Sequence, residues 1–276
     1  MILDVHHVGL AVSSMDEALA LYRDALQLPL VKEGTVPERG VHASVLAAGG
    51  SYLEVLQPFK GESDSPFRTH IDEEGEGLHH LALWSDNVES DVARLLEAQT
   101  PLADDHPREG FTGRLSYLMP AAFDGVLLEV VEPEELLNGR APAGAGGPWQ
   151  ITRIDHVVLR VPDVQKVCDR FQQLLGVSTK RTFERGGMRF AFMRPGDVVI
   201  EVIGPLEGAE PGTGRIAGLA FEVKGIDVLA SSLKATGYPV GEPHPALQGG
   251  RIVSVHHSGA CGVPLAFIDF ADSPRP

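Results

Sequence analysis

The sequence predicts an α+β protein of two tandem domains, each built from two β-α-β-β-β units that form a curved mixed sheet around a cleft. Three observations predict this architecture. Four segments have apolar residues at helical spacing, strand-like apolar runs lie between them, and the same motifs return in each half of the chain. A chain of 276 residues is long enough for two domains of about 130 residues each.

The boundary between the domains is predicted by composition. The segment at 138–150, NGRAPAGAGGPWQ, is rich in Gly, Ala and Pro and has no apolar periodicity, which is typical of a linker. We therefore expect a first domain at 1–137 and a second domain at 151–276.

Four helices are predicted in chain order. Ser14 with Glu17 three residues later forms a capping-box pattern, and the apolar stripe of this first helix contains Leu19, Tyr22 and Leu26. The other three helices are expected at roughly 87–98, at 163–175 before Gly176, and at 227–236 before Gly237, because glycine commonly follows a helix C-terminus.

Strands are predicted between these helices, because apolar runs alternate there with turn residues. The runs in the first half are VHHVGLAV, VHASVLAAGGSYLEVLQP, LHHLALW, GRLSYLMP and GVLLEVVEP. Those in the second half are IDHVVLRV, RFAFMRPGDVVIEVIGP, IAGLAFEV, GRIVSVHHSG and GVPLAFIDF.

Two His–Glu pairs recur in the first half at matched spacing, and each residue lies in a strand-like run. The two histidines are 73 residues apart and the two glutamates 75. One such pair from each of two units folded face to face would bring four ligands to one divalent metal ion, and two imidazoles with two carboxylates suit a borderline-hard ion. A lone strand histidine is more often a hydrogen-bonded structural residue, but the repeat favours a metal site formed by His7, Glu54, His80 and Glu129.

The histidines that directly precede the two predicted ligand histidines are expected on the other face of the sheet. Successive strand side chains point to opposite faces, so His6 and His79 are expected on the face opposite to His7 and His80. On the ligand face, small residues such as Ala82 follow and would leave room for a cavity.

The second half repeats the plan and loses two ligand positions. Matching IDHVVLRV to VHHVGLAV and VVIEVIGP to SYLEVLQP places His156 and Glu201 at the first two ligand positions. Gly218 and Ala266 stand at the other two. Two protein ligands are too few for a tight site, so we expect a metal-free second domain and one ion per chain.

Composition narrows the range of partners. The net charge is −15, and residues 1–140 carry 9 Lys and Arg against 25 Asp and Glu, which is unfavourable for nucleic-acid binding. No apolar run approaches the roughly 20 residues of a membrane span, and the N-terminus lacks a signal pattern, so we expect a cytoplasmic protein that does not bind membranes. Cys168 and Cys261 form no CxxC motif, and Cys168 is expected to be a buried reduced thiol.

Several segments resemble the vicinal oxygen chelate superfamily, which includes glyoxalase I, methylmalonyl-CoA epimerase, extradiol dioxygenases and the fosfomycin or bleomycin resistance proteins. The resemblance covers nearly the whole chain at the level of the fold. Over residues 5–133 the chain is most similar to the methylmalonyl-CoA epimerases, in HHVGLAVSSMDEALALYRDALQL, VPERGVHASVL, GEGLHHLAL, EGFTGRLSYLMP and DGVLLEVVEP.

The resemblance implies a function and roles for individual residues. It implies the metal ligands His7, Glu54, His80 and Glu129, with Glu54 in place of the epimerases' Gln, and a catalytic base at Glu38 in PERGV, with Glu129 as its partner across the substrate. The implied activity is a metal-dependent enolising isomerase, most simply an epimerase of a 2-substituted acyl-CoA such as methylmalonyl-CoA. The implied cofactor is one divalent ion, and Co, Ni, Zn, Mn and Mg are not distinguished.

Other activities of the same superfamily stay open. Glu54 and the two fused domains favour a lyase similar to glyoxalase I. An extradiol-type dioxygenase ordinarily uses two His and one Glu, so the additional carboxylate of Glu54 argues against it. A small-molecule-binding resistance protein is a further alternative. A monomer and a homodimer are both compatible with the sequence, because the domains can pair within one chain or between two.

Overall fold

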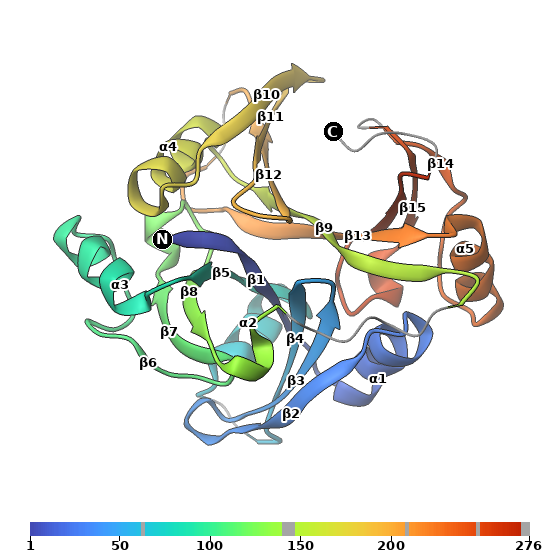
Figure 1. Ribbon diagram of the computed structural model, residues 1–276, viewed down its shortest axis with the longest axis horizontal. Coiled ribbons are helices and arrows are strands. Elements are labelled where there is room, and N and C mark those ends of the chain that lie inside the picture. Colours follow the sequence, from blue (N-terminus) through green and yellow to red (C-terminus); the bar gives the residue numbers. More distant parts are fainter. Residues whose placement is uncertain (62–63, 140–146, 208–209, 247–248, 272–276) are drawn as a thin grey trace. The chain divides into compact units, whose positions relative to one another are not determined.

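Two mixed eight-stranded sheets and five α-helices make up the described part of the chain (Figure 1). The computed structural model describes residues 1–61, 64–139, 147–207, 210–246 and 249–271. The predicted α+β class and the fourfold β-α-β-β-β repeat are confirmed.

The first sheet comes from the first half of the sequence. Its strands are β1 (Ile2–Ala11), β2 (Leu30–Val36), β3 (Val41–Ala48), β4 (Ser51–Pro58), β5 (Gly77–Ser85), β6 (Arg108–Glu109), β7 (Gly113–Leu118) and β8 (Leu128–Pro133). Their order is β2-β3-β4-β1-β5-β8-β7-β6, so the first strands of the two repeat units, β1 and β5, are neighbours at the centre.

The second sheet repeats this topology. Its strands are β9 (Gln150–Arg160), β10 (Thr179–Arg185), β11 (Met188–Met193), β12 (Val199–Pro205), β13 (Arg215–Lys224), β14 (His244–Pro245), β15 (Arg251–Val255) and β16 (Leu265–Asp269). The order is β10-β11-β12-β9-β13-β16-β15-β14, which matches the first sheet strand for strand.

The predicted helices are present, with one difference in the first. The helices are α1 (Met15–Leu19), α2 (Pro66–Glu74), α3 (Val88–Glu97), α4 (Val164–Leu175) and α5 (Ile226–Ala235). Ser14 accepts a hydrogen bond from the Glu17 amide at 3.3 Å, as the capping box predicts. The helix then continues as a π-helix, η1 (Ala20–Ala25), where the Leu26 amide donates to the Leu21 carbonyl.

Helix α4 follows the sequence prediction closely. Asp163 caps its first turn by accepting from the Lys166 amide at 3.0 Å, and the helix ends at Gly176, whose φ of 71° lies in the left-handed region. The sequence pattern does not predict α2. Pro66 occupies its first turn and Gly75 follows it, but Phe67 is its one buried residue, so no apolar stripe marks it.

The chain also divides into two compact units, each of which takes part of both sequence halves. One unit contains 1–8, 79–138 and 156–217, and the other contains 9–78, 139–155 and 218–276. Each sheet is formed by strands from one half of the sequence. Each compact unit, in contrast, combines segments from both halves. The domain boundaries stay a prediction, and most of the predicted linker, 140–146, lies outside the described residues.

Candidate metal centre

The four predicted ligands lie on four adjacent strands of the first sheet. His7 is on β1, Glu54 on β4, His80 on β5 and Glu129 on β8, and the sheet order runs β4-β1-β5-β8. All four side chains are buried, with exposed fractions of 0%, 5%, 0% and 1%. Polar side chains of this kind are rarely buried without partners, so their clustering requires a chemical explanation.

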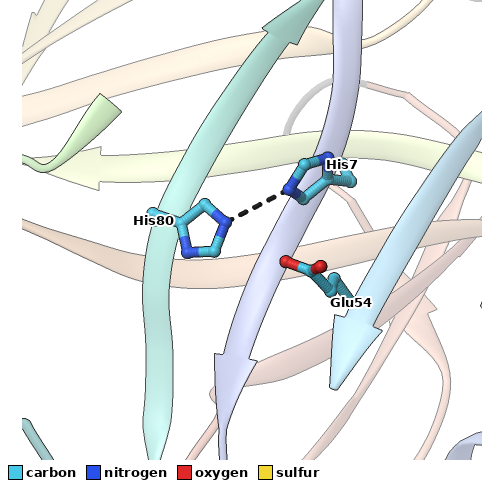
Figure 2. Close-up of side chains that lie close together, drawn as sticks. All are labelled: His7, Glu54 and His80. Carbon is cyan, nitrogen blue, oxygen red and sulfur yellow. Dashed lines mark hydrogen bonds between the residues drawn. The ribbon is translucent and has the colours of Figure 1, made fainter. Parts of the chain in front are cut away.

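Strand register explains why these side chains share a face. In the parallel pairing of β5 with β8, Ala82 lies opposite Glu129. His80 is two residues before Ala82 and therefore on the same face of the sheet. Figure 2 shows His7, Glu54 and His80 pointing toward one another from β1, β4 and β5.

The distances within the cluster are short. The Nε2 atoms of His7 and His80 are 3.1 Å apart. Each Nε2 lies 3.8 Å from an oxygen of Glu129, His7 from Oε1 and His80 from Oε2. One ligand atom from each of His7, Glu54 and His80 lies within 4.8 Å of the others. The structure thus brings the four side chains together, and ion binding by them stays a prediction.

The donor set fits a divalent cation. Two imidazole nitrogens that both offered lone pairs at 3.1 Å would repel each other unless a proton or a cation lay between them. Oε1 of Glu129 is buried and has no hydrogen-bond partner in the described part of the structure. Leaving a buried carboxylate oxygen unsatisfied is costly, and a cation ligated by this oxygen would remove that cost.

Two further histidines contact the predicted ligands, and strand alternation does not predict these contacts. His6 Nδ1 lies 2.8 Å from His7 Nδ1, and His79 Nδ1 lies 3.0 Å from His80 Nδ1. Strand alternation predicts opposite faces for such neighbours, but their rings meet through the Nδ1 atoms. The sequence signal that could have indicated these contacts is the His-His dipeptide, which occurs in both repeat units of the first half.

Glu38, the predicted base, lies outside the buried cluster. It is in the single-turn 3-10 helix η2 (Pro37–Arg39) between β2 and β3, and its side chain is exposed. The catalytic role of Glu38 stays a prediction.

An aromatic residue and a cation lie on the β8 side of the cluster. The Tyr117 ring is 5.5 Å from the His80 ring, and Tyr117 lies opposite Glu129 in the pairing of β7 with β8. The Arg108 guanidinium lies 5.6 Å from the centre of the Tyr117 ring, a cation–π contact. Sequence reasoning missed Arg108, because it lies on a two-residue strand without a motif. Tyr117 also packs against the buried cluster of Ala82, Leu115 and Val131.

The second sheet keeps the geometry of the first with fewer ligand-type residues. Ala220 lies opposite Ala266 in the pairing of β13 with β16, the same register as in β5 and β8. This register places Gly218 and Ala266 at the third and fourth ligand positions, as the sequence predicts. His156 Nε2 and Glu201 Oε2 are 3.7 Å apart.

A cavity of about 510 Å³ lies elsewhere, at the start of α4. Its lining includes Asp163, Lys166 and Arg189 and contains none of the four predicted ligands. Lys166 is paired with Asp124 at 3.2 Å, and Arg189 with Glu184 at 2.9 Å, so these cations already have carboxylate partners.

Among the described residues, no helix is long and apolar enough to cross a membrane.

Comparison with known proteins identifies relatives for both halves. A model of the glyoxalase/bleomycin resistance protein/dioxygenase superfamily matches residues 6–117 and 155–254. The uncharacterized protein YqjC of Bacillus subtilis is 32% identical over 129 residues, which are 46% of this chain and 91% of that protein. The mitochondrial methylmalonyl-CoA epimerase of Mus musculus is 29% identical over 128 residues, which are 46% of this chain and 71% of that protein.

A solved structure is similar over both halves together. A triple mutant of 4-hydroxymandelate synthase from Streptomyces coelicolor aligns with 99% of this chain and 94% of its own, with a TM-score of 0.73 and 16% identity. At this identity the match concerns the fold alone, and it is consistent with two sheets of the same topology.

Proposed function

Because the chain belongs to the glyoxalase/bleomycin resistance protein/dioxygenase superfamily, we propose that it is a metal-dependent isomerase that epimerises a 2-substituted acyl-CoA such as methylmalonyl-CoA. Members of this superfamily are mainly metal-dependent enzymes. The observation that carries the proposal is the buried cluster of two imidazoles and two carboxylates on β4, β1, β5 and β8. Similarity of the N-terminal half to methylmalonyl-CoA epimerases supports the choice of substrate.

The proposed site would hold one divalent ion between His7, Glu54, His80 and Glu129. When bound, such an ion supplies stabilisation of the negative charge that develops on a carbonyl oxygen as the neighbouring carbon loses its proton. The identity of the ion is left open among Co, Ni, Zn, Mn and Mg. The chain's own contribution is to orient these side chains and to exclude water, since all four are buried.

Epimerisation requires that a proton leave one face of the carbon and return on the other, which takes two acid–base groups. We propose Glu129 as one of them, because its carboxylate is buried beside His7 and His80 and the resemblance implies this role. Glu38 is the proposed group for the other face, and the PERGV resemblance supports this role. Glu38 lies on an exposed turn, so it would have to reach the carbon from the turn between β2 and β3.

A second candidate function is a lyase similar to glyoxalase I. The observation that favours it is Glu54, whose carboxylate lies in the cluster with His7 and His80. Both candidates use the same ligands and the same removal of a proton beside a carbonyl. They differ in the substrate, which for the lyase is a hemithioacetal of glutathione rather than an acyl-CoA.

Proton exchange with solvent tests the proposed function directly. The purified chain, loaded in turn with each of the five divalent ions, is incubated with methylmalonyl-CoA in D2O, and deuterium at carbon 2 is measured by mass spectrometry. We expect metal-dependent exchange that a chelator abolishes. A chain that binds a divalent ion, exchanges no deuterium into methylmalonyl-CoA and converts the hemithioacetal of methylglyoxal instead would establish the lyase in place of the epimerase.

A further inference from the structure

The contact between neighbouring histidines occurs twice with the same geometry. His6 and His7 meet through Nδ1 atoms at 2.8 Å with ring planes at 80°, and His79 and His80 meet through Nδ1 atoms at 3.0 Å with ring planes at 86°. In each pair the second histidine is a predicted ligand and its other ring nitrogen, Nε2, faces the cluster. The two contacts are thus equivalent features of the two repeat units.

The contacts of His6 determine where the protons lie. His6 Nε2 is 2.8 Å from the carbonyl oxygen of Leu137, which can only accept, so this nitrogen carries the hydrogen and donates it. In a neutral ring the remaining nitrogen, His6 Nδ1, is then an acceptor. His7 Nδ1 must therefore be the donor between the two rings, and the lone pair of His7 is on Nε2.

The second half of the chain lacks these neighbouring histidines and two of the four ligands. Asp155 stands at the position of His6 and is paired with Arg153 at 3.2 Å. Ala217 stands at the position of His79, beside Gly218. Both partner histidines therefore occur only in the half that has the four-ligand cluster, as expected if they serve it.

We propose that His6 and His79 are positioning residues that hold His7 and His80 in the tautomer with the hydrogen on Nδ1 and the Nε2 lone pair directed at a divalent ion. This inference rests on the proposed function, because it needs the ion. A ligating histidine commonly donates its other N–H to a carboxylate, a carbonyl or water, and this partner fixes the ring and its tautomer. Here the acceptor would be the neutral imidazole of His6 or His79. The His6 ring is itself oriented by its hydrogen bond to the Leu137 carbonyl.

A pair of substitutions at His6 separates this role from packing. His6→Leu removes the acceptor, whereas His6→Asn keeps an oxygen near the place of Nδ1 that can accept from His7. Both variants lose the hydrogen bond to the Leu137 carbonyl. His42→Leu is the control, because His42 is an exposed strand histidine that packs on Phe59, outside the cluster.

The readouts are the affinity for Co²⁺, measured by competition with a chelator, and the visible absorption of the bound Co²⁺. We expect His6→Leu to lower the affinity about 10- to 100-fold and to change the spectrum, with His6→Asn and His42→Leu near wild type. Equal losses in His6→Leu and His6→Asn, or wild-type affinity in both, would overturn the proposal. A wild-type chain that binds none of the five ions would overturn the proposed function, and this inference with it.

A measurement on the unaltered chain covers the case in which His6→Leu does not fold. Long-range ¹H–¹⁵N spectra of the metal-free chain distinguish the two neutral histidine tautomers. We expect the Nδ1–H form for His7, and the Nε2–H form would contradict the inference whatever the behaviour of the variants.

Discussion

Glu129 and His80 illustrate, for single residues, how charge and burial constrain the site. Both side chains are almost fully buried, and they approach each other at 3.8 Å. A buried carboxylate is costly unless a cation or several hydrogen bonds compensate it. A protonated histidine and a metal ion would each supply positive charge, so the two explanations are separated by measuring bound metal.

The first prediction concerns His80 itself. His80→Ala removes one of the two imidazoles of the proposed site, and the remaining ligands are a poorer set for a borderline ion. We expect both metal content and exchange activity to fall by about tenfold or more. Replacing a residue that only supports a metal ligand already has an effect of this size on metal affinity or activity. Metal content is measured by inductively coupled plasma mass spectrometry after dialysis, and unchanged occupancy would remove His80 from the ligand set.

The second prediction separates the proposed base from the ligands. Glu38 lies on an exposed turn outside the cluster, so Glu38→Gln should leave metal content unchanged. If Glu38 transfers a proton, the variant should lose exchange activity by about 10²-fold, the usual size of a general acid–base contribution. Deuterium exchange at wild-type rate in this variant would exclude Glu38 from the mechanism.

Some site residues could be predicted from the sequence, and others could not, for physical reasons. His7 and Glu54 recur as a pair at His80 and Glu129, so the repeat predicts which residues share a face. The contact of His6 with His7 is not predictable in this way, because alternation describes where side chains leave the backbone and not how far a ring extends. The exposure of Glu38 likewise depends on the turn that carries it.

At the scale of elements, helices with capped ends and buried stripes could be predicted, and others could not. Asp163 and Gly176 bracket α4, and the apolar stripe between them is buried. Helix α2 lacks a comparable stripe, because Phe67 is its one buried residue. The change from α-helix to π-helix at Ala20–Ala25 alters the pattern by one residue per turn, too small a difference to detect over so short a segment.

The third prediction concerns Asp91, which fixes α3 to the end of β5. Its carboxylate accepts hydrogen bonds from Ser85 and from Arg94, both at 2.7 Å. Burial alone would raise the pKa of Asp91. Hydrogen bonds from Arg94, Ser85 and the N-terminal ammonium, together with the charge of that ammonium, outweigh burial, and the pKa lies below its usual value. A carboxyl group with a lowered pKa stabilises the fold above its unfolded pKa, about 3.9, and loses this contribution as the pH falls through the folded pKa.

Asp91→Asn should therefore lower the free energy of unfolding at pH 7 by about 1–3 kcal/mol, since it weakens hydrogen bonds to a charged group. The difference from wild type should shrink as the pH falls from about 4 through the lower pKa of the folded state, below which the wild-type carboxyl group is neutral as well. Urea unfolding at a series of pH values measures this, with Asp72→Asn on the exposed face of α2 as the control. A difference that is constant with pH would contradict the assignment.

At the scale of the whole molecule, the internal repeat made the fold predictable. Two sheets of identical strand order follow from four copies of one unit, and the register of β13 with β16 repeats that of β5 with β8. The compact units were not predictable, because each combines repeat units from both halves of the sequence. Contacts between segments so distant in sequence leave no periodic signal.

The fourth prediction is the number of ions that the whole chain holds. The second sheet offers His156 and Glu201 at 3.7 Å, with Gly218 and Ala266 at the remaining positions. Water would have to complete the coordination of an ion there, so binding should be weak. We expect one tightly held divalent ion per chain, with stoichiometry unchanged in His156→Ala. Two tightly held ions per chain, one of which is lost in that variant, would show a second site.

The fifth prediction is that residues 1–138 do not fold alone. Each compact unit contains contacts between the two halves. In one, the Tyr22 hydroxyl donates to the Ala260 carbonyl at 3.2 Å, and in the other the Phe123 and Phe171 rings pack at 4.9 Å. Tyr22, Phe123 and Phe171 are fully buried, so removing the second half would expose large apolar surfaces in both units.

We therefore expect the truncated chain to accumulate as insoluble protein, or to unfold without a cooperative transition. Tyr22→Phe in the full chain is the matched control, because it removes one hydrogen bond between the halves, at a cost of about 1 kcal/mol, and keeps the apolar packing. If burial of apolar surface holds the halves together, this variant stays folded while the truncated chain does not. A soluble 1–138 chain with a sharp thermal transition would show that the first half is an independent domain and that the second is dispensable for folding.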